Sequence, residues 1–311
     1  MIENSAKQNK VSSSFASLSK KIMFSYQQIE EKFLQEINKD DSLKTFFNND
    51  NFYPVDKPFF KEKKWFRNTK SNDHNIDNNE GGGVMNIMRG NVFEKVGVNI
   101  STVYGSFSKQ FRGKIPGTEN NPSFFATGIS LVAHMRSPLI PAMHFNTRYI
   151  VTDKEWFGGG GDITPSMNNI NEDEINIFHD FLKESCEQYK KGSYSEFKES
   201  CDNYFFLKHR NESRGAGGIF CDYIYNKNKE DFYHNFSFIQ DMGNKILQFW
   251  PIIVEKNMLK TWTKHQKELQ LKKRGRYVEF NLLHDRGTKF GLETGGNIEA
   301  ILMSLPPTAK W

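Results

Sequence analysis

Four β-rich segments between residues 84 and 151 place the strongest constraint on the fold. The first two, residues 84–88 and 92–104, flank the turn Arg89-Gly90-Asn91. The second two, residues 124–135 and 143–151, are joined by a short connection that two prolines bound. Consecutive strands with short connections pair in antiparallel fashion. The sequence therefore predicts a sheet that is largely antiparallel.

Helix signals lie on both sides of this strand region. Ile22, Tyr26, Ile29, Phe33 and Ile37 recur at steps of three and four, which predicts an amphipathic helix over residues 17–37. Further helices are predicted at residues 171–191 with Asn171 as N-cap, at 193–208, at 230–249 and at 251–272. Helices grouped between strand runs predict an α+β fold.

The C-terminal segments show strand patterns again. Residues 215–225 predict a strand, residues 277–284 and 288–292 a hairpin around Asp285-Arg286-Gly287, and residues 298–305 a last strand. No internal repeat divides the chain, so one domain is predicted over residues 15–311, with an exposed polar loop at 57–80. The polar residues 1–14 are predicted to be disordered.

Charge and cysteine content exclude several classes of protein. The net charge of +5, from 42 basic and 37 acidic residues, is too small and dispersed for a nucleic-acid-binding protein. Cys186, Cys201 and Cys221 are odd in number and lack metal-type spacing, which indicates a reducing compartment. No apolar run reaches the roughly 20 residues of a transmembrane helix. With no signal-peptide core and no Arg-rich transit peptide, the cytoplasm is predicted ahead of the mitochondrial intermembrane space.

A polar row marks the segment from Met143 to Tyr149. Alternate side chains of a strand share a face, so His144, Asn146 and Arg148 lie together, opposite apolar neighbours. Ser130 and His134 share a face of the preceding segment and could extend the row. Arginine binds carboxylates and histidine transfers protons near neutral pH, which favours a site. The alternative is an ordinary polar face turned to solvent.

The segment from Trp156 to Pro165 contains four consecutive glycines followed by Asp162. Glycine allows close backbone approach or positive φ. The Lys-Ser/Thr pair of a phosphate-binding loop is absent, and a flexible hairpin tip is the simpler interpretation. A carboxylate that follows four residues without side chains could also pair with cationic or N–H groups of a ligand.

A transition-metal site is a third hypothesis. Imidazole suits several transition metals, and His134, His144, His179 and His209 are the candidates. Their spacings form no local ligand signature, and no His-Glu-x-x-His motif or cysteine pair accompanies them. A divalent metal stays open but is not favoured.

Several segments together resemble the aerobic, oxygen-dependent coproporphyrinogen III oxidases over roughly residues 15–311. They are Glu80-Gly-Gly-Gly-Val84, Val92-Phe-Glu-Lys-Val-Gly-Val98, His144-Phe-Asn-Thr-Arg148, Trp156-Phe-Gly-Gly-Gly-Gly-Asp-Ile-Thr-Pro165, Phe205-Phe-Leu-Lys-His-Arg-Asn-Glu212, Arg214-Gly-Ala-Gly-Gly218, Arg276-Tyr-Val-Glu-Phe-Asn-Leu282, Asp285-Arg-Gly287 and Ile301-Leu-Met-Ser-Leu-Pro-Pro307. Each alone is weak, but all of them in family order are specific.

The resemblance implies a curved antiparallel sheet flanked by helices, in a homodimer formed through residues 277–311 or so. It implies that molecular oxygen converts two propionates of coproporphyrinogen III to vinyl groups. The products are protoporphyrinogen IX, carbon dioxide and hydrogen peroxide, made in haem biosynthesis without flavin, haem or nicotinamide.

The resemblance also assigns roles to single residues. His144 matches the proposed proton donor, Arg148 a propionate-binding arginine and Asp162 an aspartate that holds pyrrole N–H groups. The substrate-binding positions are Ser130, Asn146, Thr147, Arg148, Gly295, Gly296 and Asn297. The four histidines named above match metal ligands proposed for bacterial members, whereas eukaryotic members are described as metal-free.

One position departs from the family pattern. Relatives usually carry Arg where this chain has Asn297. Losing a partly desolvated guanidinium removes a carboxylate contact worth about 1.5–3 kcal/mol. Either substrate affinity is lower here, or Arg276 or Arg286 substitutes.

Two rival functions stay open at this stage. A His-ligated metal oxygenase predicts a stoichiometric metal. A tetrapyrrole carrier, suggested by Asn297, predicts porphyrinogen binding without oxygen uptake.

Overall fold

The computed structural model describes residues 2–49, 55, 57–67, 80–107, 109, 112–167, 172–293 and 296–311. Within them, seven strands form one antiparallel sheet with the order β1-β2-β3-β4-β5-β6-β9. The strands are β1 (Lys61–Phe66), β2 (Gly81–Met88), β3 (Phe93–Ser106), β4 (Ser123–Met135), β5 (Ala142–Val151), β6 (Glu155–Thr164) and β9 (Gly218–Tyr225). The predicted α+β class with a large antiparallel sheet is confirmed.

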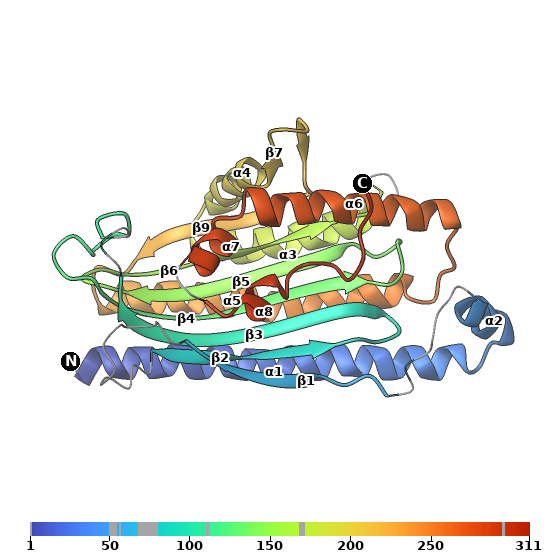
Figure 1. Ribbon diagram of the computed structural model, residues 1–311, viewed down its shortest axis with the longest axis horizontal. Helices are drawn as coiled ribbons and strands as arrows, with labels where there is room; N and C mark the ends of the chain where they lie inside the picture. The colour runs from blue at the N-terminus through green and yellow to red at the C-terminus, as the bar shows by residue number, and fades with distance from the viewer. Residues whose placement is uncertain are drawn as a thin grey trace.

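Helices cover both faces of the sheet (Figure 1). On one face lie α1 (Ile2–Ile37), α3 (Glu172–Tyr189) and α5 (Lys229–Asn257). On the other lie α6 (Lys264–Leu283), α7 (Arg286–Glu293) and α8 (Ile298–Leu302). The short helices α2 (Asp41–Asn49) and α4 (Ser193–Tyr204) and the small ribbon of β7 (Phe206–Leu207) and β8 (Glu212–Ser213) complete the described chain.

The main core lies between the sheet and the α1/α3/α5 layer. The five apolar residues that predicted the first helix, from Ile22 to Ile37, are all buried there, so that prediction is confirmed. Tyr26 of α1 stacks on Phe93 of β3 with ring centroids 4.7 Å apart. Large aromatic side chains of this kind supply much of the area that stabilises the fold.

The N-terminal part of the chain differs from the expectation of disorder. α1 begins at Ile2, and Val11 and Phe15 are buried in the main core. Lys7 also pairs with Glu155 of β6 at 2.8 Å. Val11, Phe15 and Leu18 continue the helical spacing of the later residues, so the polar residues before Phe15 form the exposed side of the same helix.

The segment expected as a polar loop at 57–80 contains an edge strand. Residues 61–66 pair with β2 as β1, and residues 68–79 lie outside the described part. Asn171, the expected N-cap of α3, also lies outside it. α4 ends at Tyr204 because the chain then enters the β7–β8 ribbon.

The predicted boundary between two helices, at residues 249–251, was wrong. α5 runs through Pro251 without a break. An internal proline costs about 3 kcal/mol, but Phe249, Trp250 and Ile253 are buried on both sides of it. Their burial keeps the helix continuous.

The predicted hairpin at 277–292 and the strand at 298–305 were wrong. Residues 264–283 form α6, which begins with a capping box between Thr263 and Gln266. α7 and α8 follow. The buried positions of α6 include Arg274, Tyr277 and Asn281, so polar residues conceal the helical period that apolar residues would reveal.

Candidate active site

Strand β5 presents a polar row to the layer of α6, α7 and α8. His144, Asn146 and Arg148 share this face, while Met143, Phe145, Thr147 and Tyr149 are buried on the other. Ser130 of β4 lies directly opposite Asn146, and Asp162 of β6 lies opposite His144. The strand pairing predicted for the two histidine-bearing segments is confirmed, and it joins their polar faces.

Hydrogen bonds connect the row into one chain. His144 Nδ1–H donates to Asp162 Oδ1 at 3.0 Å. With that tautomer, His144 Nε2 accepts from Asn146 Nδ2 at 3.4 Å. Arg148 Nη1 donates to Asn146 Oδ1 at 3.2 Å. The imidazole orientation is therefore set from both sides, and a carboxylate holds one ring nitrogen protonated.

Asp162 is itself held by a buried arginine. The exposed fractions of Asp162 and Arg214 are 2% and 1%, and Arg214 Nη2 donates to Asp162 Oδ2. The Arg214 guanidinium lies 3.9 Å from the ring centroid of Phe205 and 4.5 Å from that of Tyr277. Burial alone would raise the pKa of the Asp162 carboxyl, but Arg214 and His144 hold that pKa below its ordinary value.

Both Asp162 oxygens are thus engaged inside the protein. Each oxygen accepts one hydrogen bond, one from His144 and one from Arg214, and the residue is only 2% exposed. The geometry suits Asp162 to orient His144.

The four-glycine segment is neither a phosphate loop nor a hairpin tip. It is an internal part of β6, between β5 and β9. A Cβ on Gly160 would lie 2.0 Å from the Ile219 carbonyl oxygen of β9. The glycines therefore allow β6 and β9 to approach closely beside the polar row.

Three charged residues beside the row escaped the sequence prediction. Arg214 pairs with Asp162, and Asp222 of β9 pairs with Arg148 at 2.8 Å. Asp285 accepts from the Tyr204 hydroxyl at 2.7 Å, and although burial would raise the pKa of its carboxyl, hydrogen bonds from Tyr204 and Thr288 lower that pKa. Arg214 and Asp285 lie in segments that resembled the family, but no residue spacing indicated their partners.

Of the other predicted substrate contacts, some lie at the polar row and some do not. Ser130 lies on the polar face, as its pairing with Asn146 requires. Thr147 lies on the opposite, buried face of β5 and is not brought to the site. Asn297 caps α8 by accepting from Ala300 N at 2.9 Å, and Gly296 precedes it. Gly295 lies outside the described residues.

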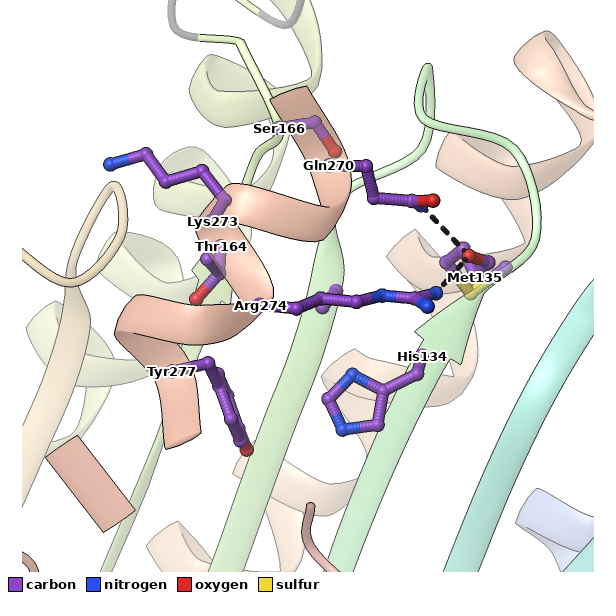
Figure 2. A pocket seen from close by; sticks show the side chains of 9 residues that line it. His134, Met135, Thr164, Ser166, Gln270, Lys273, Arg274 and Tyr277 are labelled. Carbon is purple, nitrogen blue, oxygen red and sulfur yellow. Dashed lines mark hydrogen bonds between the residues drawn. The ribbon is translucent and has the colours of Figure 1, made fainter. Parts of the chain in front are cut away.

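His134, a candidate metal ligand, is enclosed beneath α6. Figure 2 shows its ring below Arg274 and beside Tyr277, where Arg274 and Gln270 reach the Met135 carbonyl oxygen at 2.9 Å each. His134 Nε2–H donates to the Ser304 carbonyl oxygen at 2.8 Å. Burial and the Arg274 charge lower the pKa of His134 to about 3, so the ring is neutral.

The other candidate ligands occupy separate surroundings. His179 donates to the Ala216 carbonyl oxygen and accepts from the Tyr194 hydroxyl, both at 3.0 Å. His209 contacts His284 at 3.2 Å and Glu279 at 2.9 Å. In the described part of the chain, no group of three or more His, Cys, Asp or Glu side chains is placed to hold a metal ion. The four histidines do not fit one metal centre.

Comparison with known proteins identifies the family of the chain. The family described as coproporphyrinogen III oxidase matches residues 27–311. An oxygen-dependent coproporphyrinogen-III oxidase of Rickettsia bellii (strain OSU 85-389) is 63% identical over 231 residues, which cover 74% of this chain and 81% of that protein. The enzyme of the same name from Rickettsia akari (strain Hartford) is 61% identical over 234 residues, 75% of this chain and 82% of that protein.

These matches define a class of oxygen-using oxidoreductases of tetrapyrrole synthesis. The chain belongs to the coproporphyrinogen III oxidase family. None of the helices in the described ranges has the length and apolar character needed to cross a membrane.

Proposed function

We propose that this chain catalyses the oxygen-dependent oxidative decarboxylation of coproporphyrinogen III. Each of two propionates loses a hydrogen from its β-carbon and its carboxyl group as carbon dioxide, and becomes a vinyl group. One oxygen molecule is reduced to hydrogen peroxide at each step, and the product is protoporphyrinogen IX. The observation that carries the proposal is the continuous row Asp162–His144–Asn146–Arg148 on one face of the sheet.

Arg148 is the proposed anchor for the reacting propionate. Its side chain is 31% exposed, so the guanidinium is reachable from the open side of the row. Guanidinium binds carboxylates through paired N–H donors and cannot lose its charge near neutral pH. Arg148 would therefore fix the carboxyl group that leaves.

His144 is the proposed proton-handling group near the β-carbon. The Asp162 carboxylate holds its Nδ1 protonated, which leaves Nε2 as the basic atom toward Asn146 and Arg148. Asp162, in turn, keeps its charge through Arg214. The proposed role of Asp162 is to orient His144, in place of the pyrrole contact that the family resemblance implied.

Asn297 replaces the usual arginine, so a second propionate is bound either more weakly or by another cation, Arg276 or Arg286. Arg276 pairs with Glu212 at 3.0 Å. The guanidinium of Arg286 lies 5.7 Å from the ring centroid of Phe220, and that of Arg148 lies 5.9 Å from the same ring. Arg286 is therefore the better placed substitute.

The proposal assigns no step to an organic cofactor or to a metal. A porphyrinogen is rich in electrons and can supply both electrons of each oxidation itself. The protein has to bind, orient and deprotonate it, and to limit access of water.

We further propose that residues 277–311 form a homodimer contact and that the enzyme is cytoplasmic. Exposed apolar side chains gather on α6, α7 and α8, namely Leu282, Leu283, Phe290, Leu292 and Ile298. Such a group of apolar side chains is typical of an interface. The three cysteines are free and buried, which suits a reducing compartment. Replacing Leu283 with Glu should lower the mass measured by light scattering by half, whereas the exposed Phe24→Glu on α1 should not.

Anaerobic addition of coproporphyrinogen III to chelator-treated protein, followed by air, tests the function. Protoporphyrin in the oxidised extract with matching oxygen uptake supports the oxidase. Unchanged substrate that manganese or another divalent ion rescues would support a metal oxygenase. Substrate that stays bound and unchanged under every condition would indicate a carrier.

A further inference from the structure

Arg148 of β5 has a carboxylate partner on β9, which lies beyond β6 in the sheet. Asp222 Oδ2 lies 2.8 Å from Arg148 Nη2, and Asn146 accepts from Nη1 on the other side. The two partners come from different strands, and the Phe220 ring lies 5.9 Å from the guanidinium. Two of the three guanidinium nitrogens are therefore fixed before any substrate arrives.

The backbone around Asp222 is distorted in a way that places this carboxylate. Tyr223 has φ of +55°, a left-handed conformation that a bulky residue rarely adopts. Its N–H donates to Asp222 Oδ1 at 3.0 Å, and the pairing of β6 with β9 shifts register between Phe157 and Gly159. Strain of this kind persists where surrounding structure enforces it, often at functional sites.

Gly158 on β6 leaves the room that the ion pair occupies. A Cβ at this position would lie 2.8 Å from Asp222 Oδ1 and 3.2 Å from Arg148 Nη2. Strand pairing sets Gly158 directly opposite Arg148. The absent side chain at Gly158, the register shift and the left-handed conformation of Tyr223 thus all occur beside the ion pair of Arg148 and Asp222.

We propose that Asp222 is a positioning residue that fixes the orientation of Arg148 and opposes carboxylate binding at its guanidinium. The inference rests on the proposed function, in which Arg148 holds the propionate that reacts. A propionate at Arg148 lies close to the Asp222 carboxylate, and like charges repel. Asp222 therefore selects one orientation of the carboxyl group and weakens its binding. The bound substrate is then stabilised less than the transition state, which raises kcat.

The variant Asp222→Asn tests this, since an amide keeps the shape and the acceptor for Tyr223 N–H but loses the charge. The expected result is a kcat lowered about tenfold together with a KM lowered about threefold. Non-reacting coproporphyrin III should bind the variant more tightly by a similar factor, measured by tryptophan fluorescence quenching. Asp222→Glu, which restores the charge, should recover part of kcat. Glu255→Gln removes an exposed ion pair with Lys32 and should change neither constant.

Substitutions at Tyr223 provide the second test and leave Asp222 in place. Asparagine tolerates the left-handed conformation, so Tyr223→Asn should keep kcat within about twofold. Valine does not tolerate it, so Tyr223→Val should displace Asp222 and reproduce the kinetics of Asp222→Asn. A folded Asp222→Asn or Tyr223→Val protein with the kcat and KM of the wild type would overturn the inference. A wild type that fails to convert coproporphyrinogen III would instead overturn the proposed function.

Discussion

The face of the sheet beneath α1, α3 and α5 is filled with apolar side chains, whereas the face beneath α6, α7 and α8 carries the charged row. On the first face, Tyr149 and Phe157 stack at 4.7 Å and meet Phe232 of α5. On the second, Asp162 and Arg214 are as deeply buried, yet they are held by an ion pair and hydrogen bonds. The same strands therefore provide stability on one side and chemistry on the other, through the alternation of side chains along each strand.

Asp162→Ala should give the largest effect and should act mainly on turnover. Without the carboxylate, His144 loses its orienting partner, and kcat should fall about 10³-fold while KM changes only a few-fold. Steady-state kinetics on protein shown to be folded by circular dichroism measures both. Equal losses in turnover and affinity would contradict the orienting role. Glu255→Gln, on the opposite side of the sheet, is the matched control.

Phe15→Ala should weaken the apolar face and leave the chemistry intact. Phe15 is buried in the main core, and removing a buried phenyl ring lowers the free energy of unfolding by about 3 kcal/mol. Urea unfolding measures the loss, and KM of the folded enzyme should not change. Phe24 of the same helix is exposed, so Phe24→Ala should cost less than about 0.5 kcal/mol. Equal small losses at both positions would show that the N-terminal turns of α1 do not pack on the core.

The sequence alone could predict those parts of each face in which side chains repeat with a regular spacing. The alternation along a strand predicted that His144, Asn146 and Arg148 share a face, and the steps of three and four predicted α1 from Ile22 onward. Both patterns involve only residues that are close together in the sequence.

The partners of the charged row could not be predicted in the same way. Arg214 meets Asp162, and Asp222 meets Arg148, across strand pairings that no local pattern encodes. Only the last part of α6, from residue 277, was predicted as a strand. The buried face of this helix includes Arg274 and Asn281, so its apolar residues alone do not show the helical period. Polar burial, which makes the second face functional, also hides its secondary structure from sequence patterns.

The pH dependence of stability should come in part from Glu94, at the edge of the functional face. Burial would raise the pKa of this carboxyl, but Arg274 and Lys267 lower it to about 2. Because the folded pKa lies below the unfolded one, Glu94 stabilises the protein above pH 4.5, and this contribution disappears as the pH falls through 2.

Glu94→Gln should therefore cost about 2 kcal/mol at pH 6 and much less near pH 2. The measurement is urea unfolding of wild type and variant at both pH values. Glu255→Gln, in an exposed ion pair, should cost under about 1 kcal/mol at pH 6. A Glu94→Gln cost that stays constant across the range would show that packing, and not charge, accounts for it.

Asn297→Arg should give the smallest effect, and it separates the two explanations for the missing family arginine. Asn297 caps α8, so arginine there should lower the free energy of unfolding by about 1 kcal/mol. If Arg286 already binds the second propionate, the added guanidinium should leave KM within about twofold of the wild type, while Arg286→Gln should raise KM about tenfold. A tenfold lower KM in Asn297→Arg, with no effect of Arg286→Gln, would show that the functional face lacks a second cation. The cap of α8 would then have been retained at the expense of substrate affinity.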